Sequence, residues 1–285
     1  MKTLTSILVL LFGLQAATAQ PLQRVAPEQA GLDSRKLMYA DEAIETAIAG
    51  KEIPGAVLAV VRNGKMAYLK AYGNKRIYPD TEPMTVNTVF DMASCSKSIS
   101  TAVCTMILAE RGKIRLLDPV SRYIPGVKDG ESEDGKDKKV IRIADLLTHS
   151  SGLPPYAPAA ELEQKYGSPN PAGLMEYIAG CKRDFKPQTG FQYSCLNFIT
   201  LQHIIEVSGQ SLRDFARENV FDVLGMKHTD YLPCLRDKNG KWINTVPLPE
   251  NIAPTEKQPD GQVLCGQVHD PLARILNGGI SGNAG

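Results

Sequence analysis

The segment from Ser94 to Arg111 carries the strongest helical pattern in the chain, and it restricts the fold more than any other feature. Its apolar side chains recur at the spacing of one helix face: Ile99, Ala102, Val103, Met106 and Ile107. Gly112 follows the pattern directly, and glycine is a common residue at the end of a helix. A helix with such an apolar face has to be covered by other elements, so we expect the domain to be built around it.

The composition is that of a globular protein. Of 285 residues, 43% are hydrophobic and 22% are charged, which excludes disordered and fibrous classes. Lysine and arginine number 32 and aspartate and glutamate 31, for a formal net charge of +1. No basic stripe stands out along the chain, so no nucleic-acid partner is expected.

A helix followed by a β-hairpin is predicted before this central helix. Ser34 can cap a helix over residues 34–49, whose apolar side chains form one stripe. The apolar run 56–61 then leads into Asn63-Gly64, the sequence of a type I′ hairpin turn. This run is apolar enough that its strand is expected to be buried on both faces.

Several shorter helices are predicted after the central one. The apolar patterns and flanking caps place them over 141–147, 174–179, 198–207 and 211–217, the last of them capped by Ser211. The segment 128–139 is nearly all charge and glycine, which is typical of a solvated loop. No internal repeat is visible, and the order of elements favours one domain with a helical insertion.

The first 19 residues have the pattern of a secretory signal peptide. Lys2 precedes a short apolar run, 7–14, and Ala17-Thr18-Ala19 supplies a small-x-small cleavage site. The apolar run is too short for a bilayer, which needs about 20 residues, so no membrane span is expected. The alternative is a buried N-terminal strand or helix. We therefore expect an exported bacterial protein, periplasmic or secreted, with a single domain over 20–285.

The cysteines and histidines do not predict a metal site. An exported chain can form disulfides, but the six cysteines show no framework and their pairing stays open: Cys95, Cys104, Cys181, Cys195, Cys234 and Cys265. No CxxC pair is present and the four histidines are scattered, so neither a metal nor another cofactor is expected.

A serine and a lysine stand one turn apart where the central helix begins. Ser94-Cys95-Ser96-Lys97 is an S-x-x-K sequence, and residues three apart share a helix face. A serine hydroxyl becomes a useful nucleophile when an adjacent base removes its proton, and a lysine amine can be that base. The helix N-terminus offers backbone N–H groups to a developing oxyanion. The alternative is a serine cap with a lysine in the first turn.

The stretch 88–97, Thr-Val-Phe-Asp-Met-Ala-Ser-Cys-Ser-Lys, resembles the active-site box of the serine β-lactamase and penicillin-binding-protein superfamily. Within it the similarity is to class C-like serine hydrolases, which include esterases and D-peptidases. Residues 116–120, 145–154, 252–256 and 268–271 resemble further segments of that family, and the resemblance runs from about Gly31 to the last residue. It implies an α+β fold of the β-lactamase/transpeptidase type, an antiparallel sheet flanked by helices with an all-helical insertion.

The resemblance also implies catalytic roles. Ser94 corresponds to the nucleophile, and Lys97 and Tyr193 to the groups that move its proton. Tyr193 begins the family's second box, Tyr-x-Asn, which here reads Tyr193-Ser194-Cys195. His149, in the segment 145–154, corresponds to a structural position, and a catalytic role for it is the less favoured alternative.

Cys195 and Asn197 are the candidate substrate-binding residues. Cys195 stands where the family has an asparagine that helps to bind substrate and the lysine, and this departure weakens any transfer of β-lactamase activity. Asn197 lies two residues further on and is a candidate substitute. Its other interpretation is a residue that starts a helix.

The family's third box, lysine or histidine followed by threonine or serine and glycine, is not found in the sequence. Asn283-Ala284-Gly285 lacks the cation, and the stretch 278–285 better resembles an earlier loop of this branch. We therefore expect a chain that is incomplete at its C-terminus and lacks the last strands. Such a chain is expected to fold poorly alone and to have little activity.

The favoured function is that of an exported serine hydrolase acting through an acyl-enzyme on an ester, amide or β-lactam carbonyl. Esterases, D-aminopeptidases and DD-carboxypeptidases of the family are the models, with a small molecule or a cell-wall peptide as substrate. The alternative is a non-catalytic protein that binds or senses penicillin or peptidoglycan on the same fold. An α/β-hydrolase is excluded because no G-x-S-x-G is present. Substrate choice and oligomeric state stay open.

Overall fold

The computed structural model describes residues 21–128, 130–131 and 138–285. Its named helices are α1 (Ser34–Ala49), α2 (Val103–Glu110), α3 (Ile143–Leu147), α4 (Ala159–Tyr166), α5 (Pro171–Gly180), α6 (Cys195–Glu206) and α7 (Leu212–Ala216). Its strands are β1 (Gln23–Arg24), β2 (Gly55–Arg62), β3 (Lys65–Arg76), β4 (Glu82–Pro83), β5 (Gly130–Glu131), β6 (Lys138–Lys139), β7 (Cys234–Arg236) and β8 (Trp242–Asn244). The predicted signal peptide, 1–19, lies outside the described residues.

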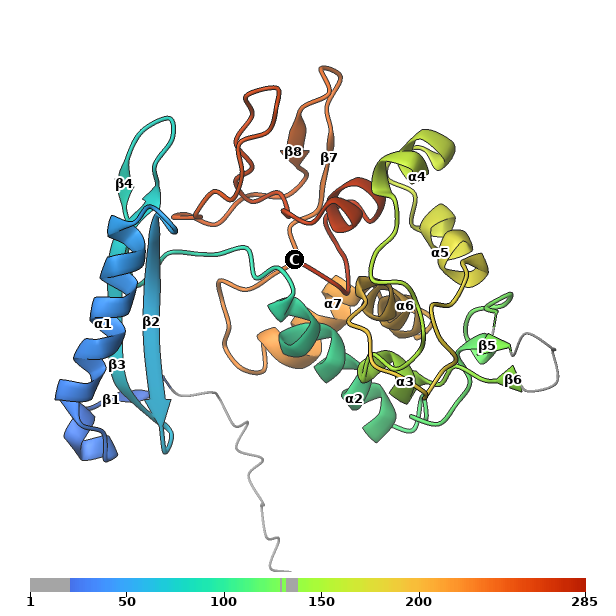
Figure 1. Cartoon of the computed structure of the whole chain (residues 1–285), viewed down its shortest axis with the longest axis horizontal. Helices are drawn as coiled ribbons and strands as arrows, with labels where there is room; N and C mark the ends of the chain where they lie inside the picture. The colour runs from blue at the N-terminus through green and yellow to red at the C-terminus, as the bar shows by residue number, and fades with distance from the viewer. Residues whose placement is uncertain (1–20, 129, 132–137) are drawn as a thin grey trace, which may run out of the picture.

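Two parts are visible in Figure 1. One is α1 packed on the sheet of β1 to β4, and the other is a larger body that contains α2 to α7. The sheet has the order β1-β3-β2, with β4 also paired to β3. β2 and β4 are antiparallel to β3, whereas β1 is parallel to it, so the sheet departs at this one strand from the antiparallel arrangement that the resemblance implied.

The hairpin of β2 and β3 has the predicted turn. Arg62 lies opposite Lys65, which leaves Asn63 and Gly64 as the two turn residues. Their φ angles are 51° and 68°, and positive φ at both positions is the property of a type I′ turn. The hairpin prediction is confirmed.

Strand β2 was predicted to be buried on both faces, and this prediction is wrong. Val61 is 49% exposed and Ala59 is also exposed. Helix α1 covers one face of the hairpin, since its Asp41 accepts hydrogen bonds from Tyr68 and Tyr72 of β3. Ala59 and Val61 point to the other face, because side chains alternate along a strand, and no described element buries them there.

Helix α1 spans the predicted range, 34–49, but its N-cap residue is Asp33 and not the predicted Ser34. The side chain of Asp33 accepts a hydrogen bond from the backbone N–H of Arg35. Ser34 is already the first residue of the helix. An N-cap residue keeps an extended backbone outside the helix, and Asp33, with φ −95° and ψ 112°, has that conformation.

The core lies in the helical body. Helix α6 is its centre, because most of its residues are buried, and α3, α5 and α7 supply the side chains around it. The fully buried side chains include Leu146, Leu174, Leu196, Leu201, Ile204 and Leu212. The helices predicted over 141–147, 174–179, 198–207 and 211–217 correspond to α3, α5, α6 and α7, and the Ser211 cap is confirmed by its hydrogen bond from Asp214 N.

The central helix lies in the helical body, and an extended segment of chain joins it to the sheet (Figure 1). Its first part is a π-helical segment, Lys97–Ala102, and α2 continues it. Gly112, with φ 67°, follows the last turn, so the predicted helix and its end are both confirmed. None of the described helices is long and apolar enough to cross a bilayer.

Candidate active site

Ser94 and Lys97 meet at the start of the central helix. Lys97 Nζ lies 3.0 Å from Ser94 Oγ and 2.8 Å from the backbone oxygen of Asn283. Ser94 is exposed, whereas only 3% of Lys97 is exposed. The lysine therefore reaches the serine from the interior, which leaves the other side of the hydroxyl open to solvent.

The buried lysine lies among aromatic rings and has no acidic partner. Its Nζ is 4.9 Å from the centre of the Tyr193 ring and 5.9 Å from that of Phe198. Among the described residues, no salt bridge joins it to a carboxylate. The segment that carries it is π-helical, and π-helical turns occur often at functional sites.

Tyr193 lies beside this pair, just before α6. Its side chain is 45% exposed, and its ring lies 4.5 Å from the ring of His149. The structure thus brings together the three residues predicted as catalytic, Ser94, Lys97 and Tyr193. It gives the phenol an accessible position over the lysine, from which it can meet a bound molecule.

The two candidate substrate-binding residues lie in different places. Cys195 begins α6, and its Sγ lies 3.6 Å from Lys97 Nζ. Burial raises the pKa of this thiol, which the positive charge of Lys97 partly offsets. Asn197 is fully buried, where it accepts a hydrogen bond from Ser151 Oγ at 2.5 Å and contacts His149 Nδ1. Cys195 therefore borders the site, and Asn197 lies behind it as part of the core.

His149 has structural partners. Its Nδ1 accepts a hydrogen bond from Ser194 N at 3.1 Å and lies 3.0 Å from Asn197 Nδ2. Because both neighbours are N–H donors, this nitrogen carries no proton, and the neutral ring holds its hydrogen on Nε2. Burial, with a contribution from the charge of Lys97, lowers the pKa of His149. The ring therefore supports the Tyr193-Ser194-Cys195 segment in its neutral form.

The structure adds two residues that were not predicted. The backbone oxygen of Asn283 accepts a hydrogen bond from Lys97, although the Asn283 side chain lacks the cation of a third box. Asp91 accepts hydrogen bonds from Ala93 N and His269 N, both at 2.7 Å. Ala93, directly before Ser94, has a φ of 45°, which is uncommon for a residue other than glycine.

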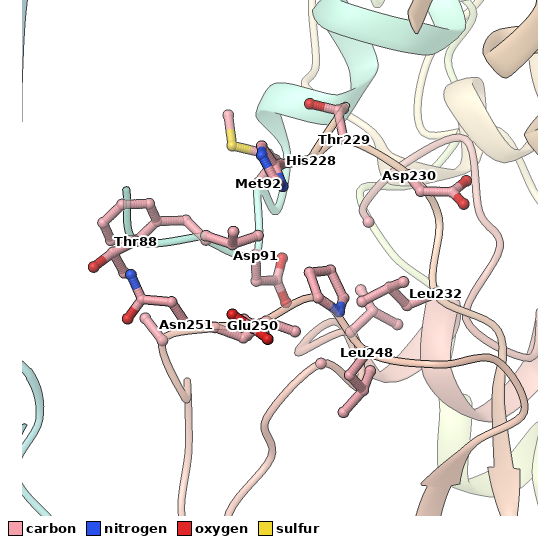
Figure 2. Close-up of a pocket in the computed structure, with 18 of the residues that line it drawn as sticks. Thr88, Asp91, Met92, His228, Thr229, Asp230, Leu232, Leu248, Glu250 and Asn251 are labelled. Atoms are coloured by element: carbon pink, nitrogen blue, oxygen red, sulfur yellow. The ribbon is translucent and has the colours of Figure 1, made fainter. Parts of the chain in front are cut away.

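A large cleft of about 1260 Å³ opens next to the Ser94 turn. Figure 2 shows Asp91 and Met92 from the segment before Ser94, with Leu248, Glu250 and Asn251 from a later loop. Ser94, Lys97 and Tyr193 do not line it. The cleft therefore borders the turn without covering the reactive groups, and the contacts of Lys97 locate the candidate site more directly.

All six cysteines have free thiols in the structure. Cys104 and Cys234 are buried and pack in apolar clusters, and burial raises the pKa of each of these thiols to about 11. Cys95 is exposed next to Ser94. Cys195 is the cysteine that contacts the lysine.

Comparison with known proteins gives a consistent result. A family model described as Beta-lactamase matches residues 40–263. A protein from Salmonella paratyphi A with the provisional name D-alanyl-D-alanine carboxypeptidase is 33% identical over 99% of this chain and 68% of its own length.

Two solved structures share the fold. The octameric penicillin-binding protein homologue from Pyrococcus abyssi has a TM-score of 0.65 and 24% identity over 89% of this chain. A class C beta lactamase has a TM-score of 0.63 and 24% identity over 88%. This chain spans 53% and 61% of those two proteins. The α+β fold of the β-lactamase/transpeptidase type is thereby confirmed.

Proposed function

The chain belongs to the beta-lactamase family, and from that premise we propose that it is an exported serine hydrolase whose Ser94 forms an acyl-enzyme. The observation that carries the proposal is the 3.0 Å contact between Ser94 Oγ and Lys97 Nζ. A buried amine beside an exposed hydroxyl is the arrangement that activates a serine without a histidine. The signal-like residues 1–19 support export.

In the proposed reaction, Ser94 Oγ attacks the carbonyl carbon of the substrate while Lys97 Nζ takes the hydroxyl proton. The tetrahedral intermediate carries its negative charge on the former carbonyl oxygen, which the backbone N–H of Ser94 can stabilise. This N–H has no hydrogen-bond partner among the described residues, so it is available for that role.

The second half of the reaction returns the enzyme to its starting state. Lys97 and Tyr193 pass the proton to the leaving group as its bond to the acyl carbon breaks. Water then attacks the acyl-enzyme, releases the acid and restores the Ser94 hydroxyl, with the same two residues accepting and returning the proton. Lys97 can serve both halves because it contacts Ser94 and lies over the Tyr193 ring.

The proposed substrates carry a carbonyl with a modest leaving group: a short ester, a peptide that ends in a D-amino acid, or a β-lactam. The D-alanyl-D-alanine carboxypeptidase name of the Salmonella relative supports the peptide. Cys195 beside Lys97 supports substrates that need no side-chain amide from this position, because a thiol is a weak hydrogen-bonding group.

Active-site labelling tests the proposal. A fluorophosphonate probe and a fluorescent penicillin are reacted with the full chain, with Ser94→Ala and with Ser98→Ala, and the labelled residue is located by mass spectrometry. Label on Ser94 is expected in the parent and in Ser98→Ala, whose exposed serine lies one turn further along. Equal labelling of Ser94→Ala, or no labelling of the parent by either probe, contradicts the proposal.

A non-catalytic binding or sensing protein is the second candidate. Cys195 in contact with Lys97 favours it, because the thiol cannot replace every contact of an amide. This candidate predicts that penicillin labels Ser94 once and that the bound penicillin is never released. It also predicts no turnover of p-nitrophenyl esters, D-alanyl peptides or nitrocefin. Repeated turnover of any of them excludes it.

A further inference from the structure

The geometry points to Asp91 as a positioning residue that holds the backbone before Ser94 in the left-handed conformation in which Ser94 and Lys97 meet. This inference rests on the proposed function, since it concerns the same serine. Asp91 itself touches neither Ser94 nor Lys97 among the described contacts. It acts on the peptide that precedes the serine.

The peptide groups around Ala93 are held on both sides. Asp91 Oδ1 accepts the hydrogen bond of Ala93 N at 2.7 Å. The backbone oxygen of Ala93 accepts one from Ser96 Oγ, also at 2.7 Å. Between these two contacts the φ of Ala93 is 45°, a conformation that an alanine avoids because its Cβ crowds the backbone. The surrounding contacts therefore have to impose it.

The second oxygen of Asp91 connects this turn to the segment around His269. Asp91 Oδ2 accepts the hydrogen bond of His269 N at 2.7 Å. The backbone oxygens of Val268 and His269 are in turn held by Arg274, which is only 5% exposed. The carboxylate thus connects the Ser94 turn to a segment that is held by a buried arginine, and Figure 2 shows Asp91 among the residues that line the cleft.

The direction of the two hydrogen bonds explains why a carboxylate is needed. Both partners are backbone N–H donors, and a carboxylate can accept on each oxygen, whereas an asparagine has one accepting oxygen and one donating nitrogen. Asp91→Asn is therefore expected to keep one of the two contacts, and Asp91→Ala neither. Without them Ala93 is free to leave the positive-φ region and carry Ser94 away from Lys97.

The test combines Asp91→Ala with a substitution that removes the need for it. Glycine adopts positive φ without the crowding of a Cβ, so Ala93→Gly should restore the turn when Asp91 is absent. The rate of Ser94 labelling by a fluorophosphonate is measured for the parent, Asp91→Ala, Asp91→Asn, Ala93→Gly and the double variant Asp91→Ala/Ala93→Gly. Asp91→Ala is expected to lower the maximal labelling rate about 100-fold, the effect of misplacing a reacting group by about 1 Å, with little change in probe affinity. The labelling rate of Asp91→Asn should lie between those of the parent and Asp91→Ala. The double variant should recover most of the parent's labelling rate.

Two control variants separate positioning from general stability. Asp237 also accepts two backbone N–H hydrogen bonds, from Asn239 and Lys241 in the β7–β8 turn, so Asp237→Ala should leave the labelling rate unchanged. Lys51, directly after α1, has a similar φ of 59° but lies in a different segment of the chain. Lys51→Gly removes the steric strain of a positive φ there and should not restore the labelling rate of Asp91→Ala. Rates are compared per folded molecule, with the folded fraction read from urea unfolding curves.

The inference is overturned if Asp91→Ala is labelled as fast as the parent, or if Ala93→Gly fails to rescue it. If the parent is not labelled at all, the proposed function fails, and the urea midpoints still decide the structural claim. In that case Ala93→Gly must stabilise the Asp91→Ala protein more than it stabilises the parent, and an equal effect in both overturns the inference.

Discussion

At the scale of single residues, the candidate site depends on one buried amine and on what surrounds it. Lys97 contacts a hydroxyl, a thiol and a backbone oxygen, and no carboxylate among the described residues. Its amine lies 3.0 Å from Ser94 Oγ, within reach of the hydroxyl proton. Lys97 is therefore placed to act on the Ser94 hydroxyl, and substitution of Lys97 tests that role.

Replacement of Lys97 distinguishes a base from a charge. Lys97→Arg keeps a positive charge that cannot be given up, so it should lose activity as Lys97→Met does, by at least about 100-fold in the rate of Ser94 acylation. The rate is measured with a fluorophosphonate under stopped-flow mixing. Lys113→Arg, at an exposed lysine near the other end of the helix, is the control and should react normally. A normal rate for Lys97→Arg contradicts the role of base.

His149 gives the protein a specific pH dependence. Its pKa in the folded state lies below the ordinary value of 6.5, mainly because of burial. As the pH falls, His149 in the unfolded chain therefore takes up a proton at a higher pH than His149 in the folded chain does. The contribution of neutral His149 to the free energy of unfolding is fully present above pH 6.5 and is lost as the pH falls below it. The urea midpoint of the parent is expected to fall between about pH 7 and pH 5.5.

Two histidine variants check the source of that pH dependence. His149→Asn should flatten it, because an amide does not titrate over this range. His228→Asn, at an exposed histidine, should keep the slope of the parent. An equal slope for the parent and His149→Asn shows that other groups are responsible.

At the scale of elements, the turn after α3 shows how a loop is fitted to the site. Residues 149–152 carry the His149 ring, and Gly152 has a φ of 77°. A Cβ at Gly152 would lie 2.0 Å from the backbone oxygen of Phe185, so a close approach and a positive φ both require glycine there. Gly112 has a similar φ of 67°, but a Cβ there would meet nothing within 4 Å.

Alanine at these two glycines should therefore have different effects. Gly112→Ala places a Cβ at a positive φ without any clash, so it is expected to lower the free energy of unfolding by about 1 kcal/mol. Gly152→Ala adds a clash with backbone and is expected to cost about 3 kcal/mol or more. Urea unfolding followed by circular dichroism measures both. Similar losses for the two variants contradict the close packing seen at Phe185.

At the scale of the whole molecule, stability is distributed unevenly. Buried apolar side chains cluster in the helical body around α6, whereas α1 contains no buried residue and β2 is partly exposed. Regions with few buried apolar contacts open more readily than the core. The two parts seen in Figure 1 are therefore expected to differ in local stability.

Hydrogen exchange measured by mass spectrometry tests this difference. Amides of α6 are expected to exchange slowest, and those of α1 and β2 faster by at least about tenfold, because the free energy of local opening is lower where burial is low. The substitution Leu201→Ala, in the core of α6, should speed exchange across the helical body more than in α1. Equal protection of α1 and α6 in the parent contradicts the uneven distribution.

The sequence predicted those features that depend on local pattern. The apolar spacing from Ile99 to Ile107 indicated the central helix, Asn63-Gly64 indicated the hairpin turn, and Ser211 indicated a cap; each is confirmed. The resemblance to the serine β-lactamase superfamily indicated the fold, which the comparisons confirm. The juxtaposition of Ser94 and Lys97 also followed from their spacing, because three residues make nearly one helical turn.

Contacts between distant segments could not be read from local pattern, and only the tertiary structure decided them. Burial of β2 depended on which elements cover its second face. The packing of α6 decided that Cys195 meets Lys97 and that Asn197 meets Ser151. The carboxylate of Asp91 found its second partner 178 residues away, at His269. Periodicity and turn chemistry act over a few residues and are written in the sequence, whereas the partner of a buried or bridging side chain is set by the packing of the whole chain.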